Sequence, residues 1–214
     1  AGYAANRLAA KRANKTALQA EMGLEVCADR PLFGVISRLT HQKGLDLLLT
    51  VGEGLTHLPA QLAVLGSGDK AMEAGFRELA ERLPGQIAVR IGFDEGLAHR
   101  IEAGADCFVM PSRFEPCGLN QMYSQAYGTL PVVHATGGLA DSVENVKLGA
   151  EGVTGTGFVM PEPTVSALQH ALQRALALFA QPQDWRRVQE QGMARDFGWE
   201  SSARAYEGVY RGIL

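Results

Sequence analysis

Cysteine is scarce in this chain of 214 residues and occurs only as Cys27, Cys107 and Cys117. Three cysteines without a C-x-x-C spacing argue against both a disulfide framework and a zinc knuckle. We therefore expect free thiols and a reducing cytoplasm as the location, or a plastid if the source is a plant.

An excess of charge of one sign and long apolar runs are also lacking. Twenty Lys and Arg residues against 23 Asp and Glu residues leave a net charge of -3, and no basic stripe is interleaved with aromatic side chains. A nucleic acid is therefore not expected as a partner. No apolar stretch approaches the roughly 20 residues that a bilayer requires. Residues 1–7 are not followed by the apolar segment of a signal peptide, so we expect neither a membrane span nor a signal sequence.

Metal-ligand patterns are missing as well. None of the five histidines pairs with another at metal-ligand spacing, and no Asp-x-Asp cluster is present, so we expect no bound metal. Each histidine is expected to be an ordinary surface or core residue: His41, His57, His99, His134 and His170.

What the chain does contain is an alternation of short β-branched runs with longer amphipathic stretches. Strand, helix, strand at this spacing predicts βαβ units, and hence an α/β, Rossmann-like, three-layer domain with a mostly parallel sheet. The length fits one large α/β domain. The expected strands are 32–36, 61–65, 87–91, 107–110 and 130–133, the helices between them are 44–55, 70–82, 96–103 and 118–127, and three further helices cover 164–180, 182–194 and 200–211.

Polar and glycine residues follow the predicted strands. In open parallel sheets, ligands bind beyond the carboxyl ends of the strands, where loops lead into helices. We therefore expect one rim of the sheet to form the binding site. It would be lined by Arg38, Lys43, Gly66, Ser67, Gly68, Gly92, Phe93, Ser112, Glu115 and residues 136–138.

Glu115 is the most informative of these residues, because the buried run 107–110 delivers it directly to a predicted helix start at Gly118. The free N–H groups and the positive end of a helix dipole favour an anion at such a place. The arrangement suits a reaction with an anionic leaving group. From the residues alone, Glu115 could equally be an acidic residue that stabilises the helix N-terminus.

Two other segments at the rim have simpler interpretations. The run Gly66-Ser67-Gly68-Asp69 is half of a dinucleotide fingerprint, and a tight turn with Asp69 as a helix N-cap explains it better. Cys117 lies beside a predicted helix start, where thiols can be reactive. No motif supplies a histidine base for it, so a small residue in a tight turn is the favoured interpretation and a thiol enzyme is rejected.

Four segments together resemble the second half of bacterial glycogen synthases and plant starch synthases, which are retaining glucosyltransferases that use nucleotide sugars. They are Phe-Glu-Pro-Cys-Gly-Leu over 114–119, Ser-Arg-Leu-Thr-His-Gln-Lys-Gly-Leu-Asp over 37–46, Thr-Gly-Gly-Leu-Ala-Asp over 136–141 and Asp-Phe-Gly-Trp over 196–199. The resemblance extends from Asn14 to Tyr210.

The resemblance implies the GT-B architecture, in which two Rossmann-like domains face each other across a cleft. The Lys-x-Gly-Gly-Leu motif of the acceptor side does not occur before residue 30. The chain therefore looks like the donor-binding half, which we do not expect to turn over alone and which would meet the α-1,4-glucan through the N-terminal half. We expect a linker and leading helix at 1–28, the nucleotide-sugar-binding domain at 29–180 and C-terminal helices at 181–214 that pack toward that half.

The resemblance also implies roles for the rim residues. Arg38 and Lys43 would contact the phosphates of the donor, and Glu115 would support positive charge at the anomeric carbon, so that these three residues would be catalytic. Gly92 and Phe93 would lie at the nucleotide base. The other residues implied at the donor are Ser112, Cys117, Gly118, Leu119 and Asn120; many relatives carry Thr at position 120. The family needs no metal and no cofactor beyond its substrate, ADP-glucose.

Two alternatives stay open. One is another retaining GT-B transferase of the sucrose- or trehalose-phosphate type, whose acidic motif carries a second Glu where this chain has Gln121 and Tyr123. The other is a non-catalytic, nucleotide-binding module. Five C-terminal aromatic residues have amphipathic spacing and are expected in the core or between domains: Trp185, Phe197, Trp199, Tyr206 and Tyr210.

Overall fold

The computed structural model describes residues 2–54, 59–150 and 152–213. Leu55, at the end of a predicted helix, and His57 therefore lie outside the described residues. Of the predicted helix, the structure describes α2 at Leu45–Gly54, and a short 3-10 turn, η2 at His41–Lys43, precedes it. Among the described residues, no helix has both the length and the apolar character to cross a bilayer.

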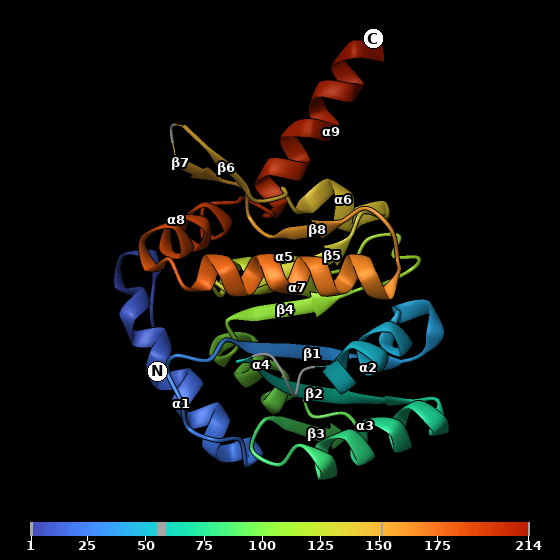
Figure 1. The fold of residues 1–214 in the computed structure, drawn as a ribbon. Coiled ribbons are helices and arrows are strands. Elements are labelled where there is room, and N and C mark those ends of the chain that lie inside the picture. The colour runs from blue at the N-terminus through green and yellow to red at the C-terminus, as the bar shows by residue number, and fades with distance from the viewer. Residues whose placement is uncertain (1, 55–58, 151, 214) are drawn as a thin grey trace.

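The centre of the molecule is a six-stranded sheet in the order β3-β2-β1-β4-β5-β8, with every neighbouring pair parallel (Figure 1). The predicted parallel sheet is confirmed. The sixth strand, β8, was not predicted, because three residues are too few to show a strand pattern. The strands are β1 (Leu32–Leu39), β2 (Gln61–Gly68), β3 (Ile87–Ile91), β4 (Cys107–Met110), β5 (Leu130–His134) and β8 (Phe158–Met160).

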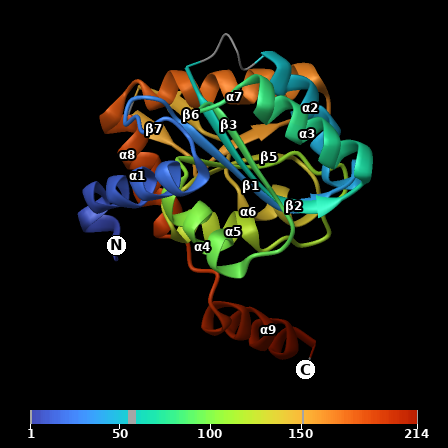
Figure 2. The ribbon, with the colours of Figure 1, turned by 90° about the horizontal axis from the view of Figure 1, so that it is seen from below.

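Helices cover both faces of the sheet, because successive residues of each buried strand point to opposite faces. In β2, Leu62 and Val64 face a core shared with α2, α3 (Lys70–Arg82), α7 (Val165–Phe179) and α8 (Pro182–Met193). The intervening Ala63 and Leu65 face a second core, shared with α1 (Lys11–Met22) and α4 (Glu95–Gly104). Figure 2 shows these layers on either side of the sheet.

The N-terminal segment is anchored to the sheet by two buried lysines. The Lys11 ammonium donates to the Ala103 carbonyl at 2.9 Å and to the Thr129 hydroxyl at 2.7 Å. Lys15 pairs with Asp106 at 2.7 Å. These contacts join α1, which follows η1 (Ala5–Ala10), to the end of α4 and to the residues just before β4 and β5.

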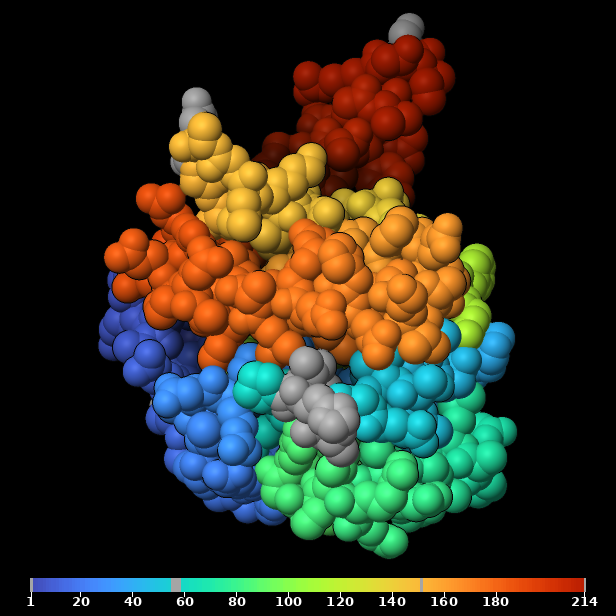
Figure 3. All heavy atoms as spheres, in the orientation of Figure 1, coloured from blue at the N-terminus to red at the C-terminus, as the bar shows by residue number. Residues whose placement is uncertain are grey.

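The C-terminal aromatic residues divide between two environments. Trp185 of α8 is buried and meets the ring of Phe179 edge-on, with centroids 5.0 Å apart, so it belongs to the core as expected. Trp199 is 88% exposed and begins α9 (Trp199–Ile213), which buries none of its described residues. Figure 3 shows α9 projecting from the body of the molecule. Trp199, Tyr206 and Tyr210 are therefore not core residues of this domain, and the other expectation, that they pack between domains, stays a prediction.

Local geometry corrects the prediction around Gly118. The helix after β4 is α5 at Asn120–Ala126, two residues later than expected. Gly118 has a φ of 74°, a left-handed conformation that cannot be part of a right-handed helix. A further short helix, α6 at Gly137–Ser142, follows β5, and a separate two-stranded antiparallel sheet of β6 (Lys147–Gly149) and β7 (Gly152–Thr154) was not predicted.

Candidate functional site

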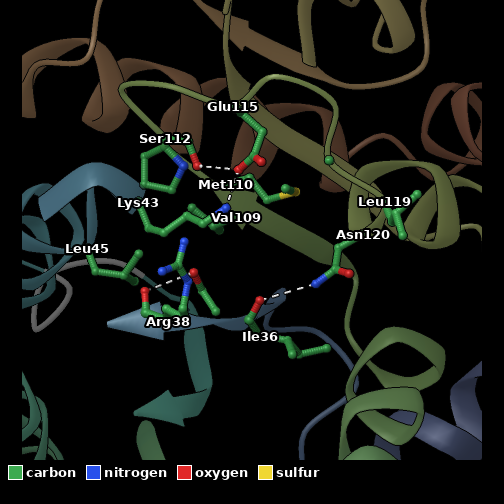
Figure 4. Close-up of a pocket in the computed structure, with 13 residues that line it drawn as sticks. Ile36, Arg38, Lys43, Leu45, Val109, Met110, Ser112, Glu115, Leu119 and Asn120 are labelled. Atoms are coloured by element: carbon green, nitrogen blue, oxygen red, sulfur yellow. Dashed lines mark hydrogen bonds and ion pairs between the residues drawn. The ribbon is translucent and has the colours of Figure 1, made fainter. Parts of the chain in front are cut away.

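A cavity of about 310 Å³ lies at the carboxyl ends of β1 and β4, near the middle of the sheet (Figure 4). The structure brings most of the predicted site residues together around it, although they come from distant parts of the chain. The lining residues are Ile36, Ser37, Arg38, Lys43, Leu45, Val109, Met110, Pro111, Ser112, Glu115, Gly118, Leu119 and Asn120.

An ion pair between Lys43 and Glu115 crosses the cavity. The Lys43 Nζ lies 2.5 Å from Oε2 of Glu115, and the two side chains are only 19% and 8% exposed. The Ser112 hydroxyl donates to the same carboxylate oxygen at 3.1 Å. The carboxylate is thus held in one orientation by two donors from two different loops.

Gly44 allows these two loops to approach each other. Its φ is 68°, and a Cβ at this position would overlap the Pro111 carbonyl well inside 3.0 Å. Only glycine adopts such a backbone while another main chain lies so close. The loop after β1, which carries Lys43, can therefore lie directly against the loop after β4, which carries Glu115.

Arg113 joins the same two loops by charge. Its guanidinium makes two hydrogen bonds of 2.7 Å to the two carboxylate oxygens of Asp46, and its backbone N–H donates to the Gln42 carbonyl at 2.9 Å. Partial burial acts to raise the pKa of Asp46, but the hydrogen bonds and charge of Arg113 outweigh it, and the pKa lies below its usual value. Such a bidentate pair fixes the position of the two loops relative to each other.

Arg38 supplies a second cation to the cavity. Its exposed guanidinium lines the cavity and makes no hydrogen bond or ion pair with a described residue. Asn120 lies across from it, and its amide donates to the Ile36 carbonyl at 3.2 Å, which ties the start of α5 to β1. Figure 4 shows both side chains beside the Lys43–Glu115 pair.

Three of the residues implied at the donor do not line this cavity, and neither do the predicted rim residues 66–68, which end β2. Gly92 and Phe93 follow β3, which is separated from β4 by β2 and β1 in the sheet order, and the Phe93 side chain is 91% exposed. Phe93 is therefore not a packing residue within this domain. Cys117 is an exposed free thiol in the loop after β4, outside the lining.

The glycine-rich segment after β5 supports the loop of Glu115 from behind. The Gly138 N–H donates to the Glu115 carbonyl at 3.2 Å, and a Cβ at Gly138 would overlap the Cys117 carbonyl. The segment follows β5 at the carboxyl edge of the sheet, as predicted, but it does not line the cavity. It stabilises the backbone of the carboxylate loop.

Sequence reasoning missed the polar contacts beneath the loop. The buried Gln121 amide donates to the Cys117 and Gly118 carbonyls at 3.1 and 3.0 Å and to the Ser142 hydroxyl at 3.1 Å. His134 Nδ1 donates to the Ser112 carbonyl at 2.8 Å, as a satisfied core histidine. No spacing rule could have found the contacts of Gln121 with Ser142 and of His134 with Ser112, because each joins residues more than 20 positions apart.

Two other predictions concern the rim. Asp69 caps α3, because its side chain accepts from Ala71 N at 2.9 Å and Met72 N at 3.1 Å, so the N-cap prediction is confirmed. In the described residues, no three His, Cys, Asp or Glu side chains gather as ligands for a metal ion.

The arrangement suits a substrate whose leaving group is an anion. Two cations at one cavity can neutralise phosphoryl oxygens whose charge grows as a bond breaks, and a preorganised field of this kind is usually the largest catalytic contribution. A carboxylate held beside them can stabilise positive charge or accept hydrogen bonds from hydroxyl groups.

Comparison with known proteins agrees with this chemistry. The family model of glycosyl transferases group 1 matches residues 24–191. The glycogen synthase of Dechloromonas aromatica is 66% identical over 214 residues, which are 100% of this chain and 44% of the relative. The chain thus spans less than half the length of that relative.

Solved structures show the same fold. The catalytic domain of starch synthase IV from Arabidopsis thaliana, bound to ADP and acarbose, matches with a TM-score of 0.88 and 34% identity over 99% of this chain and 44% of that one. Sucrose-phosphate synthase from Thermosynechococcus elongatus matches with a TM-score of 0.64 and 25% identity over 92% of this chain and 48% of that one.

Proposed function

The chain belongs to the group 1 glycosyl transferases, and we propose that it is the donor-binding part of a glycogen synthase. In this proposal the whole enzyme transfers glucose from ADP-glucose, with retention, to the non-reducing end of an α-1,4-glucan. The identity of 66% to a glycogen synthase over the whole chain supports the reaction class. The starch synthase structure, whose bound molecules are ADP and acarbose, supports the donor and acceptor classes.

The observation that carries the proposal is the meeting of Arg38, Lys43 and Glu115 at one cavity. Arg38 and Lys43 would bind the diphosphate and stabilise its growing negative charge as the glycosidic bond breaks. Glu115 would lie beside the transferred glucose, accept its hydroxyl donors and stabilise positive charge at the anomeric carbon. These are electrostatic and positioning roles, and the proposal assigns no covalent nucleophile.

The remaining donor contacts follow from the same placement. Ser112 orients Glu115, and Gly118, Leu119 and Asn120 line the side of the cavity at the start of α5. Gly92 and Phe93, beyond the cavity on the same rim, would receive the nucleotide base. Cys117 would lie near the sugar without taking part in the chemistry.

In this proposal the acceptor-binding site lies in the part of the enzyme that this chain does not span. We propose that ADP-glucose and glucan meet only when both parts are present, and that no metal or other cofactor takes part. We also propose a cytoplasmic location, because Cys27, Cys107 and Cys117 are free thiols, as a reducing compartment would keep them.

Titration of the protein with ADP and with UDP tests the proposal. We expect ADP to bind, UDP to bind more weakly, and Arg38→Ala and Lys43→Ala each to weaken ADP at least about tenfold, as expected for loss of a charge-assisted contact. Arg12→Ala and Lys147→Ala are matched controls, because both side chains are exposed and lie away from the rim. Equal weakening by the controls, or preference for UDP, would count against the assignment.

A further inference from the structure

In the Lys43–Glu115 pair, the ammonium and the carboxylate bind each other, although the proposed reaction needs the ammonium at the diphosphate and the carboxylate at the sugar. The Lys43 ammonium makes its described ion pair with Glu115 and with no other described residue. Oε2 of Glu115 receives both Lys43 and the Ser112 hydroxyl, whereas Oε1 makes no hydrogen bond with a described residue. Each group neutralises the charge of the other.

The charges at the cavity cannot remain paired in this way once a diphosphate enters. Arg38, which has no described partner, offers one free positive charge. A nucleoside diphosphate brings more than one negative charge, and placing it beside the Glu115 carboxylate adds repulsion. The positive charge that could balance the second phosphoryl group is on Lys43, which is already paired with Glu115.

The surrounding structure allows the Lys43 side chain to move while the loops stay in place. The Arg113–Asp46 hydrogen bonds and the close approach at Gly44 hold the two backbones together. A lysine side chain has a flexible four-carbon stem and three rotatable donors, so it can turn toward a new acceptor without a change of backbone. Ser112 keeps its hydrogen bond to Glu115 and can hold the carboxylate in place.

Resting on the proposed function, we infer that Lys43 exchanges partners when the donor binds, from the Glu115 carboxylate to the diphosphate. The incoming anion removes the lysine from Glu115. The carboxylate then becomes available to the sugar hydroxyls and to the positive charge at the anomeric carbon. The full charge of Glu115 is thus exposed to the sugar only when the leaving group is already bound to its cation.

A double-mutant cycle on ADP affinity tests this exchange. ADP carries the diphosphate without the sugar, so it competes for Lys43 and gains nothing from Glu115. We expect Glu115→Gln to bind ADP about five- to tenfold more tightly than the parent protein, because Lys43 is released in advance. In a Lys43→Met background no exchange is needed and only the repulsion is relieved, so the same substitution should tighten ADP binding clearly less, by about twofold.

The weak complexes are measured by NMR titration up to millimolar ADP, so that all four corners of the cycle give a value. Glu81→Gln is the matched control, because it removes the same charge from an exposed residue in the last turn of α3, at the opposite edge of the sheet. It should leave ADP affinity unchanged.

Two results would overturn the exchange while leaving the proposed function standing. One is an equal gain from Glu115→Gln in both backgrounds, which would mean simple charge repulsion. The other is weaker ADP binding by Glu115→Gln, which would mean that Glu115 holds Lys43 in its binding position. If neither the folded parent nor Glu115→Gln binds ADP, the proposed function fails and the inference fails with it.

Discussion

Gly44 is the position where a single methyl group should separate the two loops of the site. Its φ of 68° and the overlap of a Cβ with the Pro111 carbonyl are two distinct penalties for Gly44→Ala. The left-handed conformation costs about 1–2 kcal/mol for a residue with a Cβ. Relief of the overlap requires the backbone near Pro111 to move, and overpacking of this kind costs about 1–3 kcal/mol more.

Gly23 separates these two penalties. It has nearly the same φ, 74°, at the end of α1, but a Cβ there meets nothing within 4 Å. Gly23→Ala should therefore carry the conformational penalty alone, about 1–2 kcal/mol. The difference between the two variants measures the close approach of the loops.

Urea unfolding of the parent and both variants gives the free energies of unfolding, and titration with ADP gives the functional effect. We expect Gly44→Ala to lose about 2–5 kcal/mol and to bind ADP at least about tenfold more weakly, since Lys43 moves with its loop. Gly23→Ala should bind ADP like the parent. If the two variants lost the same stability and both kept ADP affinity, the loops would not depend on Gly44 for their approach, and the account of the site would be wrong.

Three further predictions concern groups outside the cavity. Burial raises the pKa of Glu102 to about 7. The free energy of unfolding is therefore highest at low pH, where Glu102 is neutral, and falls as the pH rises from about 4.5 to 7. Glu102→Gln should remove a fall of about 3 kcal/mol from the pH profile of urea unfolding. Asp46→Asn should cost about 1 kcal/mol at pH 7, a value kept small by solvent screening, and the difference from the parent should vanish as the pH falls through the lowered pKa of Asp46; thermal melts at pH 7 and pH 2.5 check this, and a constant difference would contradict it. Gln121→Leu removes the amide donor from the partly buried Cys117 and Gly118 carbonyls and should cost about 1–3 kcal/mol in urea unfolding. Gln169→Leu on the exposed face of α7 should have little effect, and equal losses would contradict the role given to the Gln121 amide.

The rim of the sheet could be predicted from the sequence, because parallel strands end at one edge wherever the chain alternates strand and helix. Arg38 lies near the carboxyl end of β1, and Ser112 and Glu115 follow β4, so their arrival at a common edge needs no knowledge of packing. Asp69 was equally predictable, since helix capping depends on residues only two or three positions apart.

Features without a local pattern were not predictable. Strand β8 is three residues long, and its pairing with β5 depends on the completed sheet. The late start of α5 depends on the left-handed backbone of Gly118, above the buried Gln121 amide. The aromatic spacing of α9 is that of a packed helix, yet no described residue of α9 is buried, because amphipathic spacing does not specify which surface a helix meets.

The sequence by itself determined the order of strands and helices, and hence which side chains reach the rim of this glycosyl transferase domain. Only the tertiary structure decided that Lys43 and Glu115, 72 residues apart, form a hydrogen-bonded ion pair of 2.5 Å. That contact depends on a glycine that admits a neighbouring carbonyl and on the Arg113–Asp46 pair, which joins two loops. Periodicity reports the direction of a side chain within its own element, whereas the distance between two loops is set by the packing of everything beneath them.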